Sequence, residues 1–177
     1  MNTAPELQVS GWLNSPPLTL AELRGKVVVV EAFQMLCPGC VSHGLPQADR
    51  IHELFPRDDV QVLGLHSVFE HHAAQTRVAL EAFVLEYRLD FPIAIDEPDG
   101  TGIPKTMARY RLRGTPSLLL FDRGGVLRQQ HFGAVPDLQL GAELMALIGE
   151  ASPLVASPAA PDATADGRCT DGACAVV

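Results

Sequence analysis

The chain has little positive charge and no long apolar run, and these two absences exclude several classes of protein. Its 177 residues include 13 lysines and arginines against 21 aspartates and glutamates, which gives a formal net charge of -8. Such a chain is not expected to bind nucleic acid or an anionic membrane surface, because it cannot replace their counterions. No stretch approaches the roughly 20 apolar residues that cross a bilayer, so no membrane span is expected.

Internal repeats and glycine-rich phosphate-binding loops are also absent from the sequence, so a nucleotide cofactor is not expected. Cysteine is scarce, with four residues in the whole chain, too few for a disulfide-stabilised scaffold of this length. The four occur as two closely spaced pairs, Cys37 with Cys40 and Cys169 with Cys174. Such pairs in a reducing compartment indicate redox chemistry or a metal site.

Apolar segments of two kinds predict an α/β domain. Four short ones read as strands, the last of them a hairpin partner after a Gly-Gly turn: residues 27–33, 60–65, 117–121 and 126–132. Residues 73–89 carry apolar side chains at near-helical spacing. A last helix is expected from Asp137, acting as its N-cap, to about Ile148.

The composition changes after residue 149. The segment ASPLVASPAAPDATADGR has no apolar periodicity and is rich in alanine, proline and serine, which is typical of a flexible linker. We therefore expect one domain over residues 1–149, a linker over 150–168 and a cysteine-containing tail over 169–177.

The first cysteine pair follows a predicted strand, in VVVVEAFQMLCPGC, where a helix should begin. Pro38 suits the first helical turn, because its missing N–H needs no partner there. Free N–H groups and the helix dipole at this end favour a thiolate at Cys37, the form that attacks disulfides. Cys40, one turn further, can close a disulfide with it. The spacing alone also fits half of a zinc site, which would need two further ligands.

Three segments, VVVVEAFQMLCPGC, YRLRGTPSLLLFDRGGV and HFGA, together resemble the thioredoxin superfamily. Its members combine a strand, an acidic residue, a CxxC pair and Gly-x-Pro-Thr/Ser before an apolar strand. The preceding PPLTLAELRGKVVVVEAF and the long segment 66–101 resemble the TlpA/ResA-type branch, which shares its layout with peroxiredoxins. The resemblance covers about residues 7–149. It implies a thioredoxin-like fold, in which helices flank a central mixed β-sheet, and the flexible C-terminal tail expected from the composition follows this domain.

The resemblance also implies a thiol:disulfide oxidoreductase and assigns roles by position. Cys37 matches the nucleophile and Cys40 the resolving cysteine. Pro116 matches the proline that the superfamily holds in the cis form beside the disulfide. The backbone of Thr115 would bind an extended substrate by strand addition.

Glu31 stands where thioredoxins have a buried acid, six residues before Cys37. Burial would raise its pKa and suit it to accept the proton of Cys40 as that sulfur attacks the mixed disulfide. The alternative is a carboxylate at the end of a strand that is turned to solvent.

The sequence departs from the thioredoxin pattern at two places. Leu36 replaces the tryptophan that usually precedes the first cysteine, so the substrate groove formed with Pro38 should differ in shape. Pro46 follows Cys40 one residue later than usual, with Gly44 nearby, so a distortion at the helix start is expected.

Two other functions compete with the oxidoreductase. A peroxiredoxin-type peroxidase would need a threonine three residues before its reactive cysteine, where this chain has Gln34. A metal-binding protein could use both cysteine pairs. His66, His71 and His72 are close in sequence, but adjacent histidines face different sides of an element, so no metal site is expected there.

The second cysteine pair encloses Asp171-Gly172, a favoured two-residue hairpin turn, in CTDGAC. The turn would bring Cys169 and Cys174 within disulfide distance. A linker of about 19 residues has a root-mean-square reach of about 24 Å. This pair could therefore exchange disulfides with the first, and an idle tail or a soft-metal site is the alternative.

The expected partners are protein or small-molecule disulfides and an electron-donor thiol system, with no cofactor beyond the thiols. The start MNTAPELQVS lacks a basic n-region and an apolar h-region. We expect a cytoplasmic protein if this N-terminus is native, and otherwise a periplasmic one, as is usual for TlpA/ResA-type proteins.

Overall fold

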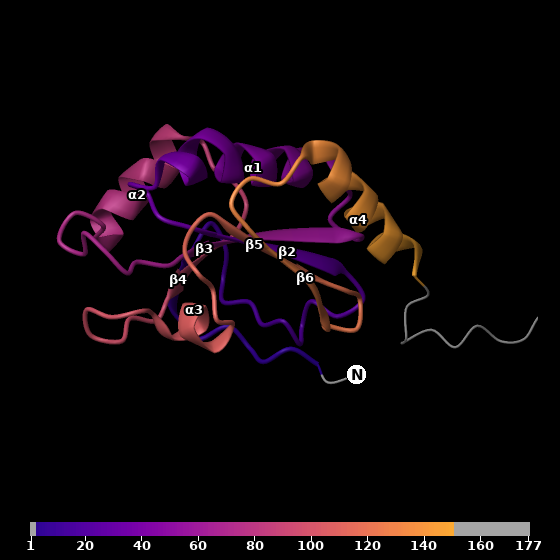
Figure 1. Ribbon diagram of the computed structural model, residues 1–177, viewed down its shortest axis with the longest axis horizontal. Coiled ribbons are helices and arrows are strands. Elements are labelled where there is room, and N and C mark those ends of the chain that lie inside the picture. The colour runs from indigo at the N-terminus through magenta and orange to yellow at the C-terminus, as the bar shows by residue number, and fades with distance from the viewer. Residues whose placement is uncertain (1–2, 151–177) are drawn as a thin grey trace, which may run out of the picture.

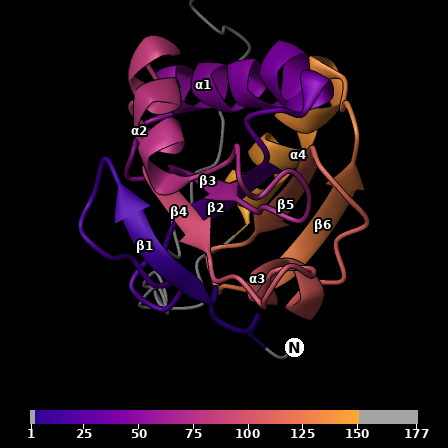
Figure 2. The same cartoon turned by 90° about the vertical axis from the view of Figure 1, so that its left-hand side faces the viewer.

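The computed structural model describes residues 3–150. They form one six-stranded sheet between two layers (Figures 1 and 2). The strands lie in the order β1-β4-β3-β2-β5-β6, with these bounds: β1 Val9–Leu13, β2 Val27–Phe33, β3 Val60–His66, β4 Ile93–Asp96, β5 Ser117–Phe121 and β6 Leu127–Phe132. The helical segments are η1 Cys40–Gly44, α1 Leu45–Leu54, α2 Arg77–Glu86, α3 Lys105–Arg109 and α4 Asp137–Gly149.

The sheet is mixed, as the resemblance implied. β2, β3 and β4 are parallel, whereas β1, β5 and β6 each run antiparallel to their neighbour. The carboxyl ends of β2, β3 and β4 therefore meet at one end of the sheet, where open α/β sheets bind their ligands. Among residues 3–150 no helix is long and apolar enough to cross a membrane.

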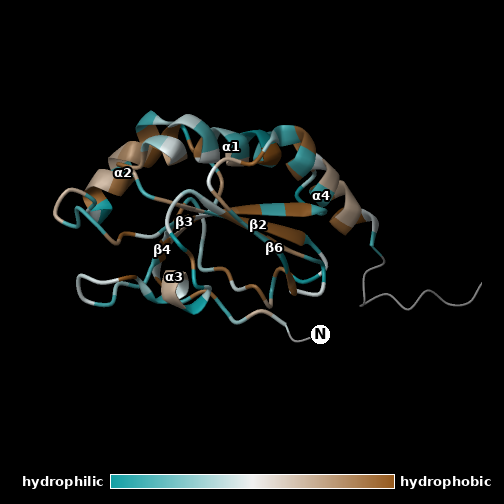
Figure 3. Ribbon diagram, in the orientation of Figure 1, coloured by the Kyte–Doolittle hydropathy of each residue, from teal (hydrophilic) through white to brown (hydrophobic). Residues whose placement is uncertain are grey.

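β2 is central because both of its faces are covered, which explains its unbroken apolar sequence. All seven of its residues are buried. Val27, Val29 and Phe33 pack with α1, α2 and α4, and Val28 and Val30 pack on the other side with α3 and the N-terminal segment. Figure 3 shows the apolar strands between these two layers.

One expected helix extent and one expected N-cap residue were wrong, whereas the expected extent of the last helix agrees with α4. The segment 73–89 is helical only over Arg77–Glu86, because Thr76 is the N-cap and accepts a hydrogen bond from the Ala79 N–H at 3.3 Å. Asp137 lies in the first turn of α4, whose N-cap is Pro136. Its carboxylate accepts hydrogen bonds from Gln47 and Arg50 of α1 instead, and these bonds lower its pKa. Asp137 therefore joins two helices rather than capping one.

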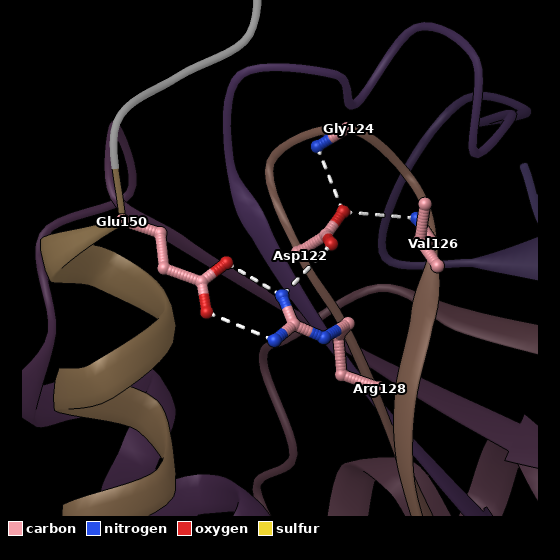
Figure 4. A network of polar contacts seen from close by, with 5 residues as sticks. All are labelled: Asp122, Gly124, Val126, Arg128 and Glu150. Carbon is pink, nitrogen blue, oxygen red and sulfur yellow. Dashed lines mark hydrogen bonds and ion pairs between the residues drawn. The ribbon is translucent and has the colours of Figure 1, made fainter. Parts of the chain in front are cut away.

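The end of α4 is fixed to the β5–β6 hairpin by an ionic network (Figure 4). Arg128 of β6 forms two hydrogen bonds with the carboxylate of Glu150, at 2.5 and 2.9 Å, and one with Asp122 at 3.1 Å. Asp122 also accepts hydrogen bonds from the N–H groups of Gly124 and Val126 in the turn. The last described residue is thus held against the hairpin.

Candidate functional site

Cys37 lies at the start of the helix that follows β2, which is where the sequence predicted it. Helical structure begins at Pro38, and the carbonyl of Cys37 accepts hydrogen bonds from the N–H groups of Cys40 and Val41. The Cys37 sulfur itself lies 3.2 Å from the Cys40 nitrogen. A backbone donor and the positive end of the helix therefore both face this sulfur, and both stabilise a thiolate.

Cys37 and Cys40 form a disulfide, with their Cα atoms 5.3 Å apart. The two sulfurs differ in access, because Cys37 is partly exposed whereas Cys40 is fully buried. Leu36 and Pro38 flank Cys37 in the chain; Leu36 is 55% exposed and Pro38 is also exposed. Both side chains therefore border the reachable sulfur. A substrate disulfide can approach Cys37 and not Cys40.

The loop before β5 forms the other side of the site. The Thr115-Pro116 peptide bond is cis, and the carbonyl oxygen of Thr115 lies 3.5 Å from the Cys37 sulfur. Gly39 lies against the Pro116 ring, since a Cβ there would be 3.2 Å from its Cδ. The structure thus brings Cys37, Thr115 and Pro116 together, although about 80 residues separate them in the sequence.

Glu31 is buried, with 2% of its surface exposed, so the solvent-facing alternative is wrong. Burial raises the pKa of its carboxyl well above the ordinary value. Its Oε1 atom has no hydrogen-bond partner in residues 3–150. Alternation along β2 places Glu31 on the same side of the sheet as Phe33, the side that packs with Cys40 and α1.

The helix distortion that the late proline predicted is a π-helical turn over Cys40–Gly44. α1 follows directly, with Pro46 in its first turn. The wider turn absorbs the one extra residue between Cys40 and Pro46. It also brings the Gly44 backbone against Glu31, where a Cβ would overlap Oε1 and lie 3.1 Å from the Cβ of Pro116.

Gln75, which the sequence reasoning missed, supports the chain just before Cys37. Its Oε1 accepts a hydrogen bond from the Met35 N–H at 3.0 Å, and its Nε2 donates to Gln34 Oε1 at 2.7 Å. The same Nε2 lies 2.9 Å from the carbonyl oxygen of Glu70. No motif in the sequence points to Gln75, because it lies about 40 residues from Gln34 and Met35.

The histidines are divided by the fold. His66 and His72 line a cavity of about 170 Å³ at the carboxyl ends of β3 and β4, whereas His71 is exposed. The Nε2 atoms of His66 and His72 are buried and have no hydrogen-bond partner among the residues that the structure describes. Burial lowers the pKa of His66 to about 4, and a side-chain hydrogen bond with Gln75 opposes this shift. Within residues 3–150, no three His, Cys, Asp or Glu side chains are placed to hold a metal ion.

Cys169, Cys174 and the predicted linker lie outside the described residues, so the second redox pair stays a prediction from the sequence.

A model of the AhpC/TSA family matches residues 2–130. The chain belongs to this family. A crystal structure of a thioredoxin-like superfamily protein is 59% identical, with a TM-score of 0.84, and the match covers 85% of this chain and 99% of that one. A thiol-disulfide isomerase from Corynebacterium glutamicum is 53% identical, with a TM-score of 0.81 and coverage of 83% and 96%. The thioredoxin-like fold is therefore confirmed.

Two curated relatives match similar lengths of the chain. The thiol-disulfide oxidoreductase ResA of Halalkalibacterium halodurans is 26% identical over 136 residues, which are 77% of this chain and 70% of that protein. The protein DipZ of Mycobacterium bovis is 31% identical over 136 residues. The match covers 74% of this chain but only 18% of DipZ, so the chain spans about a fifth of that relative. Together the matches confirm a ResA-like thiol-disulfide oxidoreductase domain.

Proposed function

We propose that this chain exchanges disulfides with protein substrates, with Cys37 as the nucleophile and Cys40 as the resolving cysteine. The observation that carries the proposal is the environment of Cys37. Its sulfur is the reachable one of the pair, and it lies 3.2 Å from a backbone nitrogen at a helix start. That environment favours an ionised, accessible sulfur, which disulfide exchange requires.

The exchange takes two balanced steps. The Cys37 thiolate attacks a substrate disulfide, forms a mixed disulfide and releases one substrate thiolate. Cys40 then loses its proton and attacks the Cys37 sulfur, which releases the second substrate thiolate and leaves the Cys37–Cys40 disulfide. A donor dithiol reduces that disulfide to complete the cycle, and reversal of the steps oxidises a substrate instead.

In its ionised form, Glu31 takes the proton of Cys40 in the second step. Its raised pKa supports this role, because an ionised carboxylate in a buried site is a stronger base than one in water. The unpartnered Oε1 leaves the group free to take a proton. The Thr115 backbone, with Pro116, Leu36 and Pro38 around it, binds the extended substrate beside the Cys37 sulfur.

The decisive experiment measures reduction of a disulfide-bonded peptide with dithiothreitol as the donor. All variants carry serine at Cys169 and Cys174, so that only the first pair is tested. Cys37→Ser should lower the rate at least about 100-fold, because the thiolate is lost. Cys40→Ser should instead accumulate a mixed disulfide at Cys37. Glu31→Gln should remove one pKa from the pH profile of the second step. A Cys37→Ser variant that retains its rate would refute the proposal.

The peroxidase alternative has less support. The Gln34 side chain, at the position of the peroxidase threonine, is buried and bound to Gln75 at 2.7 Å. Because its side-chain oxygen is bound to Gln75, Gln34 does not take the place of the threonine that orients a peroxide at the reactive cysteine. The compartment and the electron-donor thiol system stay predictions. A measurement of the reduction potential against glutathione would show in which direction the pair exchanges disulfides.

A further inference from the structure

Arg113 and Phe132 form a wall beside the substrate-binding loop. The Cζ atom of Arg113 lies 5.2 Å from the centre of the Phe132 ring. That ring lies over Gly114, where a Cβ would be 3.0 Å from it. Gly114 directly precedes Thr115, whose carbonyl oxygen is 3.5 Å from the Cys37 sulfur. The Arg113–Phe132 wall is therefore part of the surface that a substrate on Cys37 would touch.

The wall is open to a partner. Phe132 is 53% exposed and Arg113 is also exposed. Four other arginines of residues 3–150 form ion pairs with carboxylates, namely Arg50, Arg77, Arg123 and Arg128. Arg113 has no such pair within that part of the chain. A guanidinium that lies over an aromatic ring keeps its edge N–H groups available, and their planar fork matches a carboxylate.

The charge at this place contrasts with that of the whole protein. The chain has a net charge of -8, yet the connection between α3 and β5 carries Arg111 as well as Arg113, both exposed. Neither has a carboxylate partner among the described residues. An acidic protein with unpaired cations on the connection that leads to Thr115 is arranged to attract negative charge to that loop.

We propose that the Arg113–Phe132 wall selects disulfide substrates that carry an aspartate or glutamate near the reactive cysteine. This inference rests on the proposed function. Arg113 and Thr115 are two residues apart, so at most about 7 Å of backbone separates them. In an added strand, residues two apart share a side and lie about 6.6 Å from each other. The acidic residue of the substrate is therefore expected about two residues from its reactive cysteine. Phe132 would pack against the substrate residue next to that acid.

The test uses disulfide-bonded peptides of equal length that carry Glu, Gln or Lys two residues before or after the reactive cysteine. For the full chain, kcat/KM should fall in the order Glu, Gln, Lys, with about a threefold preference for Glu over Gln at low salt, as an exposed ion pair gives. The preference should disappear in about 0.5 M salt and in Arg113→Gln. Phe132→Leu should weaken it, because the guanidinium loses its support.

Arg24→Gln is the matched control. It removes the same charge at the opposite end of the sheet, where Arg24 binds the Gly124 carbonyl, so it should keep the preference for Glu. Equal rates for Glu and Lys peptides would overturn the inference, as would an equal effect of the Arg24 and Arg113 variants. If even the Gln peptide is not reduced, the proposed function itself fails; if it is reduced without any charge preference, only this inference fails.

Discussion

Gly44 and Glu31 are in contact between the π-helical turn and β2, and the contact leaves no space for a side chain at position 44. A Cβ there would overlap Oε1 of Glu31 and lie 3.0 Å from its Cδ. Neither neighbour can easily move, because Glu31 is fully buried in the central strand and Gly44 is buried within the turn. The Glu31 carboxyl thus occupies the space that a side chain at position 44 would fill.

The first prediction concerns Gly44→Ala. Overpacking of a buried site costs about 2 kcal/mol, so the free energy of unfolding of the oxidised protein should fall by about that amount in guanidinium titrations. The pH profile of the second step should shift as well, because the carboxyl must move. The cost should be less than half as large in a Glu31→Ala background, since the clash is removed there.

Gly141→Ala on α4 is the matched control for Gly44→Ala, because nothing lies within 4 Å of the added methyl group. It should leave stability unchanged or raise it by up to about 1 kcal/mol, as alanine favours helices. Equal costs of Gly44→Ala in both backgrounds would show that Glu31 is not what the methyl group meets.

The second prediction follows from the raised pKa of Glu31. Above the ordinary carboxyl pKa, the unfolded chain has lost this proton while the folded protein still holds it. The free energy of unfolding should therefore fall as the pH rises from about 5 through the raised pKa, by about 1.4 kcal/mol per pH unit. Glu31→Gln should remove this decline, which denaturant titrations between about pH 5 and about pH 8 would detect. Parallel curves for both proteins would contradict it.

The third prediction concerns His66, whose effect on the pH dependence of stability has the opposite sign to that of Glu31. Burial lowers the pKa of His66 from 6.5 to about 4, so between these values the unfolded chain binds a proton that the folded protein does not. Stability that is present above about pH 6.5 should be lost as the pH falls to about 4, by about 3 kcal/mol. The His66→Gln variant should lose less stability than the wild type over this pH range. His71→Gln, at an exposed position, should follow the wild-type curve, and the prediction fails if the two variants behave alike.

The fourth prediction tests the second cysteine pair. In a Cys40→Ser variant Cys37 has no partner of its own, so mild oxidation should join it to Cys169 or Cys174 within one chain. Mass spectrometry of peptides after digestion would identify the crosslink. Replacing both tail cysteines by serine should abolish it. A Cys37 that remains free, or pairs only with another molecule, would argue for an idle tail or a metal-binding role.

The sequence was most informative where one strand or one motif decides the structure. The valine run before Glu31 has no polar side that could face water, so a buried central strand was expected, and β2 confirms it. Cys37 and Pro116 were placed together by a resemblance rather than by their spacing. What could not be predicted depends on contacts between distant segments, such as Gln75 holding the Met35 N–H. The N-cap role of Asp137 was wrong for the same reason, since two side chains of α1 bind its carboxylate.

The Arg128–Glu150 network determines where anything attached after α4 leaves the domain. β5 runs antiparallel to β2, with Phe121 opposite Val28, so the hairpin turn that holds Glu150 lies at the start of β2, whereas Cys37 follows its end. Seven strand residues, about 20 Å, separate the two ends. The protein can therefore be attached to an electrode or a display carrier beyond Glu150, and its Cys37 sulfur will still face the solution.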